Sequence, residues 1–494
     1  MILKEKKSPL KVTMNNKKSF YITTTLPYVN APLHMGHALE FVRADTIARL
    51  KKLQGFDVYF NTGSDEHGIK IYEKATEKKI SVQDFVDQGF ETFKEQLKIF
   101  GVSEDIHFVR TTSADHQYAA QSFWKLVYDN NFIYKKNYEA KYCAGCESEK
   151  TDSELVNGEC PCHPGMKLKI INEENYFFKY SAFTDKLLKF YEENPNFIVP
   201  EFRFNEIKNF VKNGLQDFSI SRLKEKMPWG IPVPGDDTQV MYVWFDALVN
   251  YISTLGWPKN SENFEKYWKN GTPTQYCGKD NTRFQGAMWQ VMLFSAGLPN
   301  SHQIIVNGFI TGDGGVRMSK TLGNIVDPRD IVSEYGTDAL RYFLLREVSS
   351  FEDSPFTIER FKDAYNAGLA NGLGNLVSRI MTMAVNYGVK LNEEEMKIDY
   401  FAEKKESLEK YDINKFINWI WECLGALDQY IQKNEPFKKI KVDKKGAEKD
   451  VHYLLLHLYK ASLAIEPMLP ETSQKIQKLI RENKKPEAPL FLRK

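Results

Sequence analysis

Residues 20–37, FYITTTLPYVNAPLHMGH, decide the fold that we predict for this chain. The run Phe20–Thr25 is rich in aromatic and β-branched residues and predicts a strand, which Pro27 and Pro32 bring to an end. From His34 to Lys52 apolar residues recur at helical spacing, so a helix should follow after a short loop. A strand, a loop and a helix in this order favour an α/β fold with a parallel sheet.

More strands of this kind are predicted further along the chain. The run Val58–Gly63 predicts a second buried strand, and the polar segment Ser64-Asp65-Glu66-His67-Gly68 follows its carboxyl end. Ligands of open parallel sheets bind outside the carboxyl ends of the strands, so both loops lie where a site is expected. The second half of the sheet is predicted from strand-like runs at Gln239–Phe245, Thr274–Cys277 and Gln303–Val306.

The composition is typical of a folded protein with several domains. A chain of 494 residues should form two to four domains, at roughly 100–200 residues each. Its formal net charge is +2, so any nucleic-acid surface must be a local patch. No apolar run reaches the ~18 residues of a membrane span, and the lysine-rich start lacks the hydrophobic segment of a secretory signal. We therefore expect a cytoplasmic protein that does not bind membranes.

Four of the six cysteines lie close together and predict a metal site. Cys143-Ala144-Gly145-Cys146 is followed, thirteen residues on, by Cys160-Pro161-Cys162-His163. This pattern is typical of a tetrahedral zinc knuckle in a reducing compartment. Five candidate ligands compete for four places. The two-residue gap from Cys160 to His163 suits a knuckle better than the gap to Cys162, so we expect one structural Zn²⁺ on Cys143, Cys146, Cys160 and His163.

The segment His34-Met35-Gly36-His37 opens the predicted helix. The i, i+3 spacing places both imidazoles on one face, near free backbone N–H groups that favour a phosphate. Gly36 has no side chain, so a planar base could pack against the helix. Alone, the motif fits two surface histidines equally well.

The loop Gly314-Gly315-Val316-Arg317-Met318-Ser319-Lys320-Thr321 carries two cations and two hydroxyls and could close over a triphosphate. Alone, an exposed hairpin would be the commoner interpretation. Together, however, the two motifs resemble the His-Ile-Gly-His and Lys-Met-Ser-Lys-Ser elements of class I aminoacyl-tRNA synthetases, in the right order and roughly 280 residues apart.

The resemblance implies a reaction in which an amino-acid carboxylate attacks the α-phosphate of ATP, with Mg²⁺. His34 and His37 would stabilise charge on the phosphates, and Lys320 with Arg317 would bind the β- and γ-phosphates. Arg317 stands where the family usually has lysine, and Thr321 where it has serine. The resemblance also assigns ATP contacts to Gly36, Gly278, Asp280 and Ser319.

Within this family the chain is most similar to the methionine-specific branch. Thr25-Leu26-Pro27-Tyr28-Val29-Asn30 matches its first loop, and Asp65 matches the residue that binds the substrate ammonium. Aromatic faces suit a polarizable thioether. The resemblance implies a methionine site of Leu26, Tyr28, Asp65, Trp244, Ala247, Tyr251, Arg222 and Gln285. Two departures are Gln285 and Asn307, which replace histidines of the family.

The end of the chain is predicted to be helical, with long amphipathic stretches at Ala364–Tyr387, Ile413–Lys433 and Asp450–Ile465. Asn371, Asn375 and Arg379 share one helix face at i, i+4, i+8, which by itself is typical of a solvated stripe. The resemblance makes them readers of the CAU anticodon of methionine tRNA, with Phe437 stacking on a base where the family has tryptophan. We expect a monomer, since the chain ends straight after the bundle.

The resemblance implies a class I Rossmann-type parallel sheet that is split by a zinc-bearing insert and followed by an all-helical bundle. The expected parts are a basic tail (1–19), the first half of the catalytic domain (20–131), the insert with the zinc knuckle (132–235), the second catalytic half (236–326), a stem-contact linker (327–360) and the anticodon-binding domain (361–494).

Other functions fit the sequence less well. A nucleotidylyltransferase would share the paired histidines but would need neither a zinc insert nor a helical anticodon domain. Isoleucyl, valyl and leucyl enzymes carry a large editing insertion, and residues 132–234 are too few to hold one. A binding module without catalysis should have lost His34, His37, Asp65 or Lys320, and all four are present.

Overall fold

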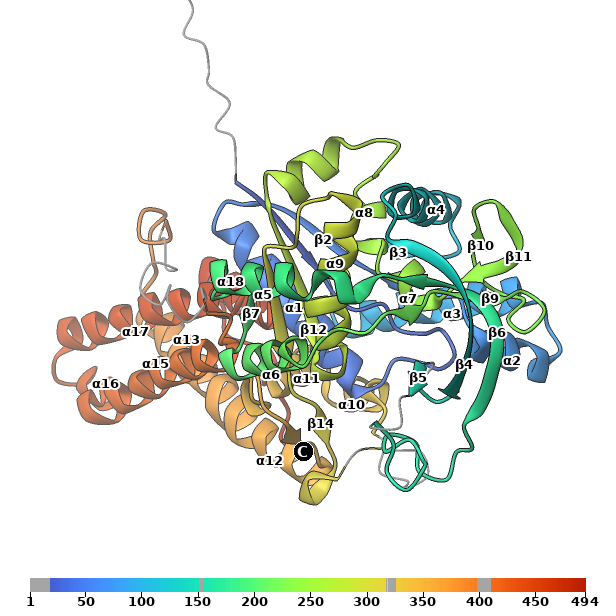
Figure 1. Cartoon of the computed structure of the whole chain (residues 1–494). Helices are drawn as coiled ribbons and strands as arrows, with labels where there is room; N and C mark the ends of the chain where they lie inside the picture. Colours follow the sequence, from blue (N-terminus) through green and yellow to red (C-terminus); the bar gives the residue numbers. More distant parts are fainter. Residues whose placement is uncertain (1–17, 147, 151–153, 317, 319–325, 398–409) are drawn as a thin grey trace, which may run out of the picture.

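The structure is a computed structural model, and it describes residues 18–146, 148–150, 154–316, 318, 326–397 and 410–494. Its centre is a parallel sheet in the order β3-β2-β1-β12-β13-β7 (Figure 1). The strands span Ser19–Thr23 (β1), Asp57–Ser64 (β2), His107–Arg110 (β3), Ile198–Val199 (β7), Thr272–Gly278 (β12) and Gln303–Asn307 (β13). All neighbouring pairs in this sheet are parallel.

The two halves of the sheet meet where β1 lies beside β12. From β1 the chain moves outward to β2 and β3, and after a long excursion it returns through β12 to β13 on the other side. The strand order therefore reverses at this point, which is the usual place for a ligand in an open parallel sheet. The split parallel sheet expected from the sequence is confirmed, including strands at Thr274–Cys277 and Gln303–Val306.

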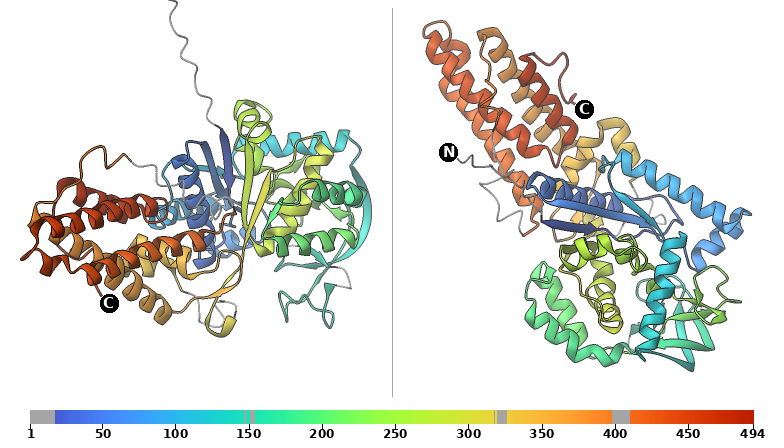
Figure 2. Two further views of the ribbon diagram at one scale, coloured as in Figure 1. Left: turned by 90° about the vertical axis from the view of Figure 1, so that its left-hand side faces the viewer. Right: turned by 90° about the horizontal axis from the view of Figure 1, so that it is seen from above.

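Helices cover both faces of the sheet because side chains of β1 alternate between two cores. Phe20 and Ile22 pack on the face covered by α1 (Met35–Leu53), whereas Tyr21 packs on the opposite face with Trp124 and Trp289. Figure 2 shows the sheet between these two groups of helices. The helices of the catalytic halves are α2 (Ile69–Lys78), α3 (Val82–Ile99), α4 (Ala114–Asp129), α7 (Val243–Ala247), α8 (Asn250–Ser253) and α9 (Trp289–Ala296).

The segment expected to be an insert has its own antiparallel strands. One sheet has the order β5-β4-β6-β8 and a smaller one the order β10-β11-β9. Figure 1 shows β4 and β6 as a long curved ribbon. The elements are β4 (Ile133–Cys143), β5 (Ser148–Lys150), β6 (Lys169–Phe178), α5 (Thr184–Glu193), α6 (Glu201–Lys212), β8 (Phe218–Ser219), β9 (Ser221–Leu223), β10 (Pro232–Val233) and β11 (Asp236–Met241).

One expectation about the strands is wrong, and one strand of the central sheet was not expected. The run Gln239–Phe245 is not a strand of the central sheet, because β11 ends at Met241 in the small antiparallel sheet and α7 follows at once. Its aromatic residues have high strand propensity, but tertiary packing places them on a helix instead. Strand β7 was not predicted. It lies in the segment expected to be an insert, yet it pairs with β13 at the edge of the central sheet. Two residues are too few to give a periodic signal.

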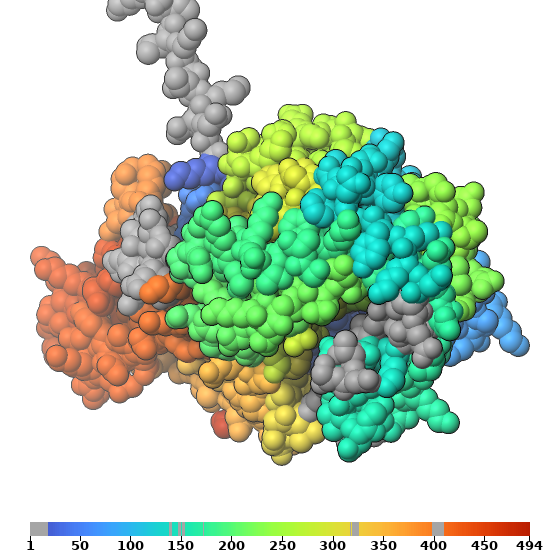
Figure 3. Space-filling model, viewed as in Figure 1, coloured from blue at the N-terminus to red at the C-terminus, as the bar shows by residue number. Residues whose placement is uncertain are grey.

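The described residues after β13 are mainly helical, and those from α12 (Ile358–Ala364) onward form an arm beside the sheet, seen in orange and red in Figure 3. Long helices occur where amphipathic stretches predict them. The elements are β14 (Ile310–Thr311), α10 (Pro328–Tyr335), α11 (Thr337–Tyr342), β15 (Ser354–Pro355), α12 (Ile358–Ala364), α13 (Asn375–Tyr387), α15 (Ile413–Asn434), α16 (Pro436–Lys439), α17 (Lys444–Ile465) and α18 (Pro470–Glu482). A π-helix at Tyr365–Gly374 joins α12 to α13. Among the described residues, no helix is both long and apolar enough to cross a membrane.

A buried ion pair joins the arm to the sheet. Arg341 of α11 lies 2.9 Å from Asp45 of α1, and both side chains are fully buried. The Arg341 guanidinium also donates to the carbonyls of Met468 (2.7 Å) and Pro467 (3.1 Å), which precede α18. A buried charge is tolerated only when it is paired and hydrogen-bonded, so this contact fixes one arrangement of the arm.

Candidate active site

A cavity of about 460 Å³ opens at the point where the strand order reverses. The loops that follow β1, β12 and β13 contribute to its wall, together with the first turns of α1. Its lining includes residues from both motifs and from the predicted methionine site, namely Leu26, Tyr28, His34, Gly36, His37, Trp244, Gly278, Asp280, Asn307, Gly315 and Met318.

The paired histidines form the amino end of α1. His34 is the N-cap, and its Nδ1 accepts from the backbone N–H of Gly36 (3.1 Å). The His34 N–H donates to Nδ1 of His37 (3.2 Å), and the two rings stack at 3.8 Å. A Cβ at Gly36 would lie 3.0 Å from the His34 ring, which explains why glycine stands between them. This cap holds both imidazoles at the edge of the cavity.

The protonation state of His37 follows from its surroundings. Desolvation, with the neighbouring His34, holds the pKa of His37 well below its usual range, so the ring is neutral. Since its Nδ1 accepts from the His34 N–H, the proton lies on Nε2. A neutral imidazole of this tautomer can donate one hydrogen bond to a phosphate oxygen.

Glu40 is a lining residue that the sequence analysis missed. It follows His37 at i+3 on α1, so the helix spacing could have revealed it. One carboxyl oxygen accepts from the backbone N–H of Thr25 (2.6 Å), which ties the first loop to α1. Burial raises the pKa of Glu40 to about 8, so the group is protonated at neutral pH.

Glu40 should make stability fall with rising pH. Its pKa of about 8 exceeds its ordinary value of 4.5, so between these values the folded chain holds a proton that the unfolded chain releases. We expect the Tm of the wild type to fall more steeply from about pH 5 to 8 than that of Glu40→Gln, whose amide oxygen can still accept from Thr25. Thermal unfolding at several pH values measures both slopes, and equal slopes would contradict this assignment.

The predicted methionine residues divide into two groups. Leu26, Tyr28 and Trp244 line the cavity, and the Trp244 ring stacks on Phe284 at 3.8 Å. Phe284 was not predicted, because its contact with Trp244 spans forty residues of chain. Asp65 is buried behind the first loop, where its N–H donates to the Pro27 carbonyl (3.0 Å).

The other predicted methionine residues, Ala247, Tyr251, Arg222 and Gln285, are buried and do not line the cavity. The Tyr251 carbonyl accepts from the Tyr21 hydroxyl (2.9 Å), and Arg222 donates to the Ser219 hydroxyl (2.8 Å). The Gln285 amide donates to Thr25 Oγ1 (3.3 Å). The Ala247 side chain lies on the short helix α7, next to Asp246.

The residues predicted to contact ATP come together only in part within the described chain. Gly278, the last residue of β12, and Asp280, in the turn that follows, line the same cavity as the histidines. Arg317, Ser319, Lys320 and Thr321 lie outside the described residues. Gly315 and Met318 of the same loop reach the cavity wall.

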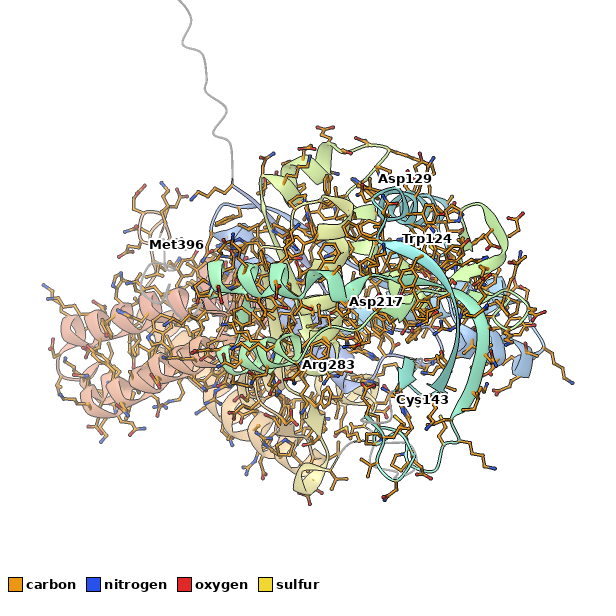
Figure 4. All side chains as sticks on the ribbon, viewed as in Figure 1. Trp124, Asp129, Cys143, Asp217, Arg283 and Met396 are labelled. Carbon is orange, nitrogen blue, oxygen red and sulfur yellow. The ribbon has the colours of Figure 1, made fainter. Side chains whose placement is uncertain are left out.

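Four side chains of the insert form a compact cluster near Cys143, which is labelled in Figure 4. One ligand atom from each of Cys143, Cys146, Cys160 and His163 lies within 4.8 Å of the others. Cys146 Sγ is 3.5 Å from Cys160 Sγ and 3.3 Å from His163 Nδ1. Thiolates around a tetrahedral zinc lie about 3.8 Å apart, given Zn–S bonds near 2.3 Å. The donor set and its spacing therefore fit Zn²⁺, whereas Cys162 is exposed and outside the cluster.

The ligand choice predicts different metal contents for two neighbouring cysteine variants. Cys160→Ser should lose the bound zinc, because one of four donors is gone, while Cys162→Ser should keep about one zinc per chain. Elemental analysis of the purified variants measures this ratio. Zinc loss from Cys162→Ser together with retention in His163→Ala would show that the fourth ligand was chosen wrongly.

The predicted anticodon residues lie on the arm. Asn371 and Asn375 are exposed, and Arg379 forms an ion pair with Asp428 of α15. Phe437 is 45% exposed at the start of α16, so its ring is open to solvent. Asn371 lies in the π-helix and the other two in α13, so the simple i, i+4, i+8 spacing is modified between them.

The split parallel sheet and the paired histidines at its switch point define the catalytic domain of a class I tRNA synthetase. Residues 20–169 and 164–381 match the family described as tRNA synthetases class I (M). The chain belongs to this family.

Individual relatives agree with this membership. The chain is 42% identical to the methionine–tRNA ligase of Caldanaerobacter subterraneus, over 93% of this chain and 73% of the relative. It is 35% identical to that of Brucella suis, over 93% and 91%. A solved structure of Mycobacterium tuberculosis methionyl-tRNA synthetase in complex with methionyl-adenylate is 34% identical, covers 94% of each chain and superposes with a TM-score of 0.86.

Proposed function

We propose that this chain acts as a methionine–tRNA ligase. It activates L-methionine with ATP to methionyl-adenylate and pyrophosphate, and then transfers methionine to the 3′-terminal adenosine of a methionine tRNA. The observation that carries the proposal is the single cavity in which His34 and His37 face the loop of Gly278 and Asp280 beside Leu26, Tyr28 and Trp244. The similar M. tuberculosis enzyme was solved with methionyl-adenylate, the intermediate of this reaction.

In the first step the methionine carboxylate attacks the α-phosphorus of ATP. A carboxylate–phosphorus bond forms, the bond from Pα to the bridging oxygen breaks, and pyrophosphate leaves. We assign the His37 Nε2–H, with His34, to donation to phosphate oxygens as charge develops. Lys320 and Arg317 would bind the β- and γ-phosphates, with Mg²⁺ on ATP and Ser319 beside them, while Gly36 gives the base room and Asp280 accepts from the ribose hydroxyls. In the second step a ribose hydroxyl of the terminal adenosine attacks the activated carbonyl and AMP leaves.

The methionine site is proposed on the floor of the cavity. Leu26, Tyr28 and Trp244 would contact the thioether, since aromatic faces suit a polarizable sulfur. Asp65 would pair with the substrate ammonium. Ala247, Tyr251, Gln285 and Arg222 are buried and would shape this surface from behind.

The zinc is proposed to be structural. Cys143, Cys146, Cys160 and His163 would fill all four places of a tetrahedral ion, so it would have no open position for a substrate. Its role would be to fold the knuckle between β4 and β6.

The arm is proposed to bind the CAU anticodon. Asn371, Asn375 and Arg379 offer hydrogen-bonding groups for unpaired base edges, and the exposed Phe437 ring offers a surface for stacking. Residues 327–360 would contact the tRNA stem.

The same proposal divides the chain into parts that end at residues 19, 131, 235, 326 and 360. It also includes action as a monomer and a cytoplasmic location. Light scattering of the purified chain would test the monomer.

The function is tested by ATP–pyrophosphate exchange with each of the twenty amino acids, followed by charging of methionine tRNA. We expect exchange with methionine and charging of tRNA that carries a CAU anticodon. Equal exchange with isoleucine or leucine would overturn the methionine assignment.

A further inference from the structure

A buried carboxylate links the two sides of the methionine site. Asp246 of α7 lies between two histidines: its Oδ2 is 2.7 Å from His67 Nδ1 and its Oδ1 is 2.8 Å from His116 Nε2. His67 follows β2, and His116 lies in the first turn of α4. The Asp246 and His116 side chains are fully buried. Three elements that are distant in sequence thus meet at one carboxylate.

The protons of this cluster are well defined. Burial alone would raise the pKa of Asp246, but His67 and His116 overcome this effect and hold it below its usual range. The carboxylate is therefore ionised and can only accept, so both nitrogens that face it carry hydrogen. The far nitrogen of His116 lies 2.9 Å from the Ser253 hydroxyl on α8.

The cluster is coupled to the residue proposed to bind the substrate ammonium. The backbone N–H of His67 lies 3.4 Å from Oδ1 of Asp65, two residues earlier. The Asp65 backbone in turn pairs with the first loop, since the Val29 N–H donates to its carbonyl (3.3 Å). On the other side, Asp246 lies in α7 between Trp244 and Ala247. Holding Asp246 in place therefore holds the loop that carries Asp65 in a fixed position relative to Trp244, which lines the cavity.

A negative charge in this place also favours a cation. Water is excluded from the cluster, so its charge is screened less than a surface charge would be. A carboxylate linked to Asp65 through His67 should thus lower the free energy of an ammonium group bound at Asp65.

We propose that Asp246, held by His67 and His116, is a positioning residue that sets the affinity and selectivity of the site for the ammonium group of methionine. This inference rests on the proposed function, in which Asp65 pairs with that ammonium. The group recognised is a primary ammonium next to a thioether side chain.

The test compares Asp246→Asn with the wild type in binding three ligands: L-methionine, methioninol, which keeps the ammonium, and 4-(methylsulfanyl)butanoate, which lacks it. Asparagine keeps the shape but removes the charge and one acceptor. We expect a roughly 10- to 100-fold loss of affinity for both ammonium ligands, the range found when a hydrogen-bonded partner that orients a metal ligand is removed. The affinity for the butanoate and the KM for ATP should change by less than about 3-fold, because neither ligand uses the ammonium site.

Asp450→Asn provides a matched control for loss of stability. Asp450 is also a buried carboxylate with two donors, Tyr430 Oη (2.9 Å) and Lys439 Nζ (3.0 Å), but it lies on α17 in the arm. The variant Asp450→Asn should lower the Tm without changing methionine binding. Ser253→Ala, a second variant in the cluster, should fold normally and shift methionine affinity in the same direction by a smaller factor.

Two results would overturn the inference. One is unchanged methionine affinity in Asp246→Asn; the other is an equal loss for all three ligands. Failure of the proposed function is distinguishable, because the wild type would then show no methionine-dependent exchange at all.

Discussion

Replacing His37 by alanine is expected to lower the rate of methionine-dependent ATP–pyrophosphate exchange by roughly 10²- to 10³-fold, the usual cost of removing one preorganised donor to a transition state. The reason lies in the tautomer of the ring: Nδ1 accepts from the His34 backbone, which leaves Nε2–H as a donor toward phosphate. The loss should appear in kcat, while the KM for methionine changes little, since the ring faces developing phosphate charge.

Two further variants make this result interpretable. His302→Ala removes an exposed histidine at the amino end of β13, remote from the cavity at the carboxyl ends, and should leave exchange unchanged. Lys320→Ala should reduce exchange as strongly as His37→Ala, an expectation that comes from the sequence motif alone. A His37→Ala variant with normal kcat would show that the His37 ring only completes the cap that His34 forms on α1.

The second large effect is expected on the arm and only with tRNA present. Phe437→Ala and Arg379→Ala should lower charging at limiting tRNA by roughly ten- to a few-hundred-fold, in line with ~1–3 kcal/mol per stacked base, and leave pyrophosphate exchange intact. The Arg379–Asp428 pair is partly exposed and therefore worth little, so the guanidinium can exchange its partner for a base edge at small cost.

Arg481→Ala is the matched control for the arm, because Arg481 of α18 contacts Gln477 of the same helix instead of a predicted reader. It should charge tRNA normally. Normal charging by Phe437→Ala and Arg379→Ala, or equal loss of exchange, would mean that this face is solvated or that both residues only support the fold.

The sequence was most informative where chemistry depends on short spacing. His34 and His37 are three residues apart on one helix, and the knuckle cysteines occur in two short segments, so local geometry alone places them together. Glu40 could have been found by the same rule. The strand patterns of β1, β2, β12 and β13 succeeded for the same reason, since each is long enough to show its apolar run.

What the sequence could not provide depends on contacts between distant segments. The stack of Trp244 on Phe284 and the pairing of Asp246 with His116, 130 residues apart, leave no periodic trace. Strand β7 is too short to be seen, and α7 carries residues whose propensity favours a strand. Such features arise from packing, which propensities describe poorly.

The buried pair of Arg341 and Asp45 has a consequence for the choice of tRNA. The same helix, α1, carries His34 at its start and Asp45 near its middle, and Arg341 binds the chain just before α18. The separation between the cavity and Phe437 is therefore held by a charged, dehydrated contact and by the apolar core around it, instead of by a flexible joint. Under the proposed function, a tRNA that reaches both places has to match this separation, so the length and bend of the whole nucleic acid would become a selection criterion alongside the proposed contacts to its anticodon.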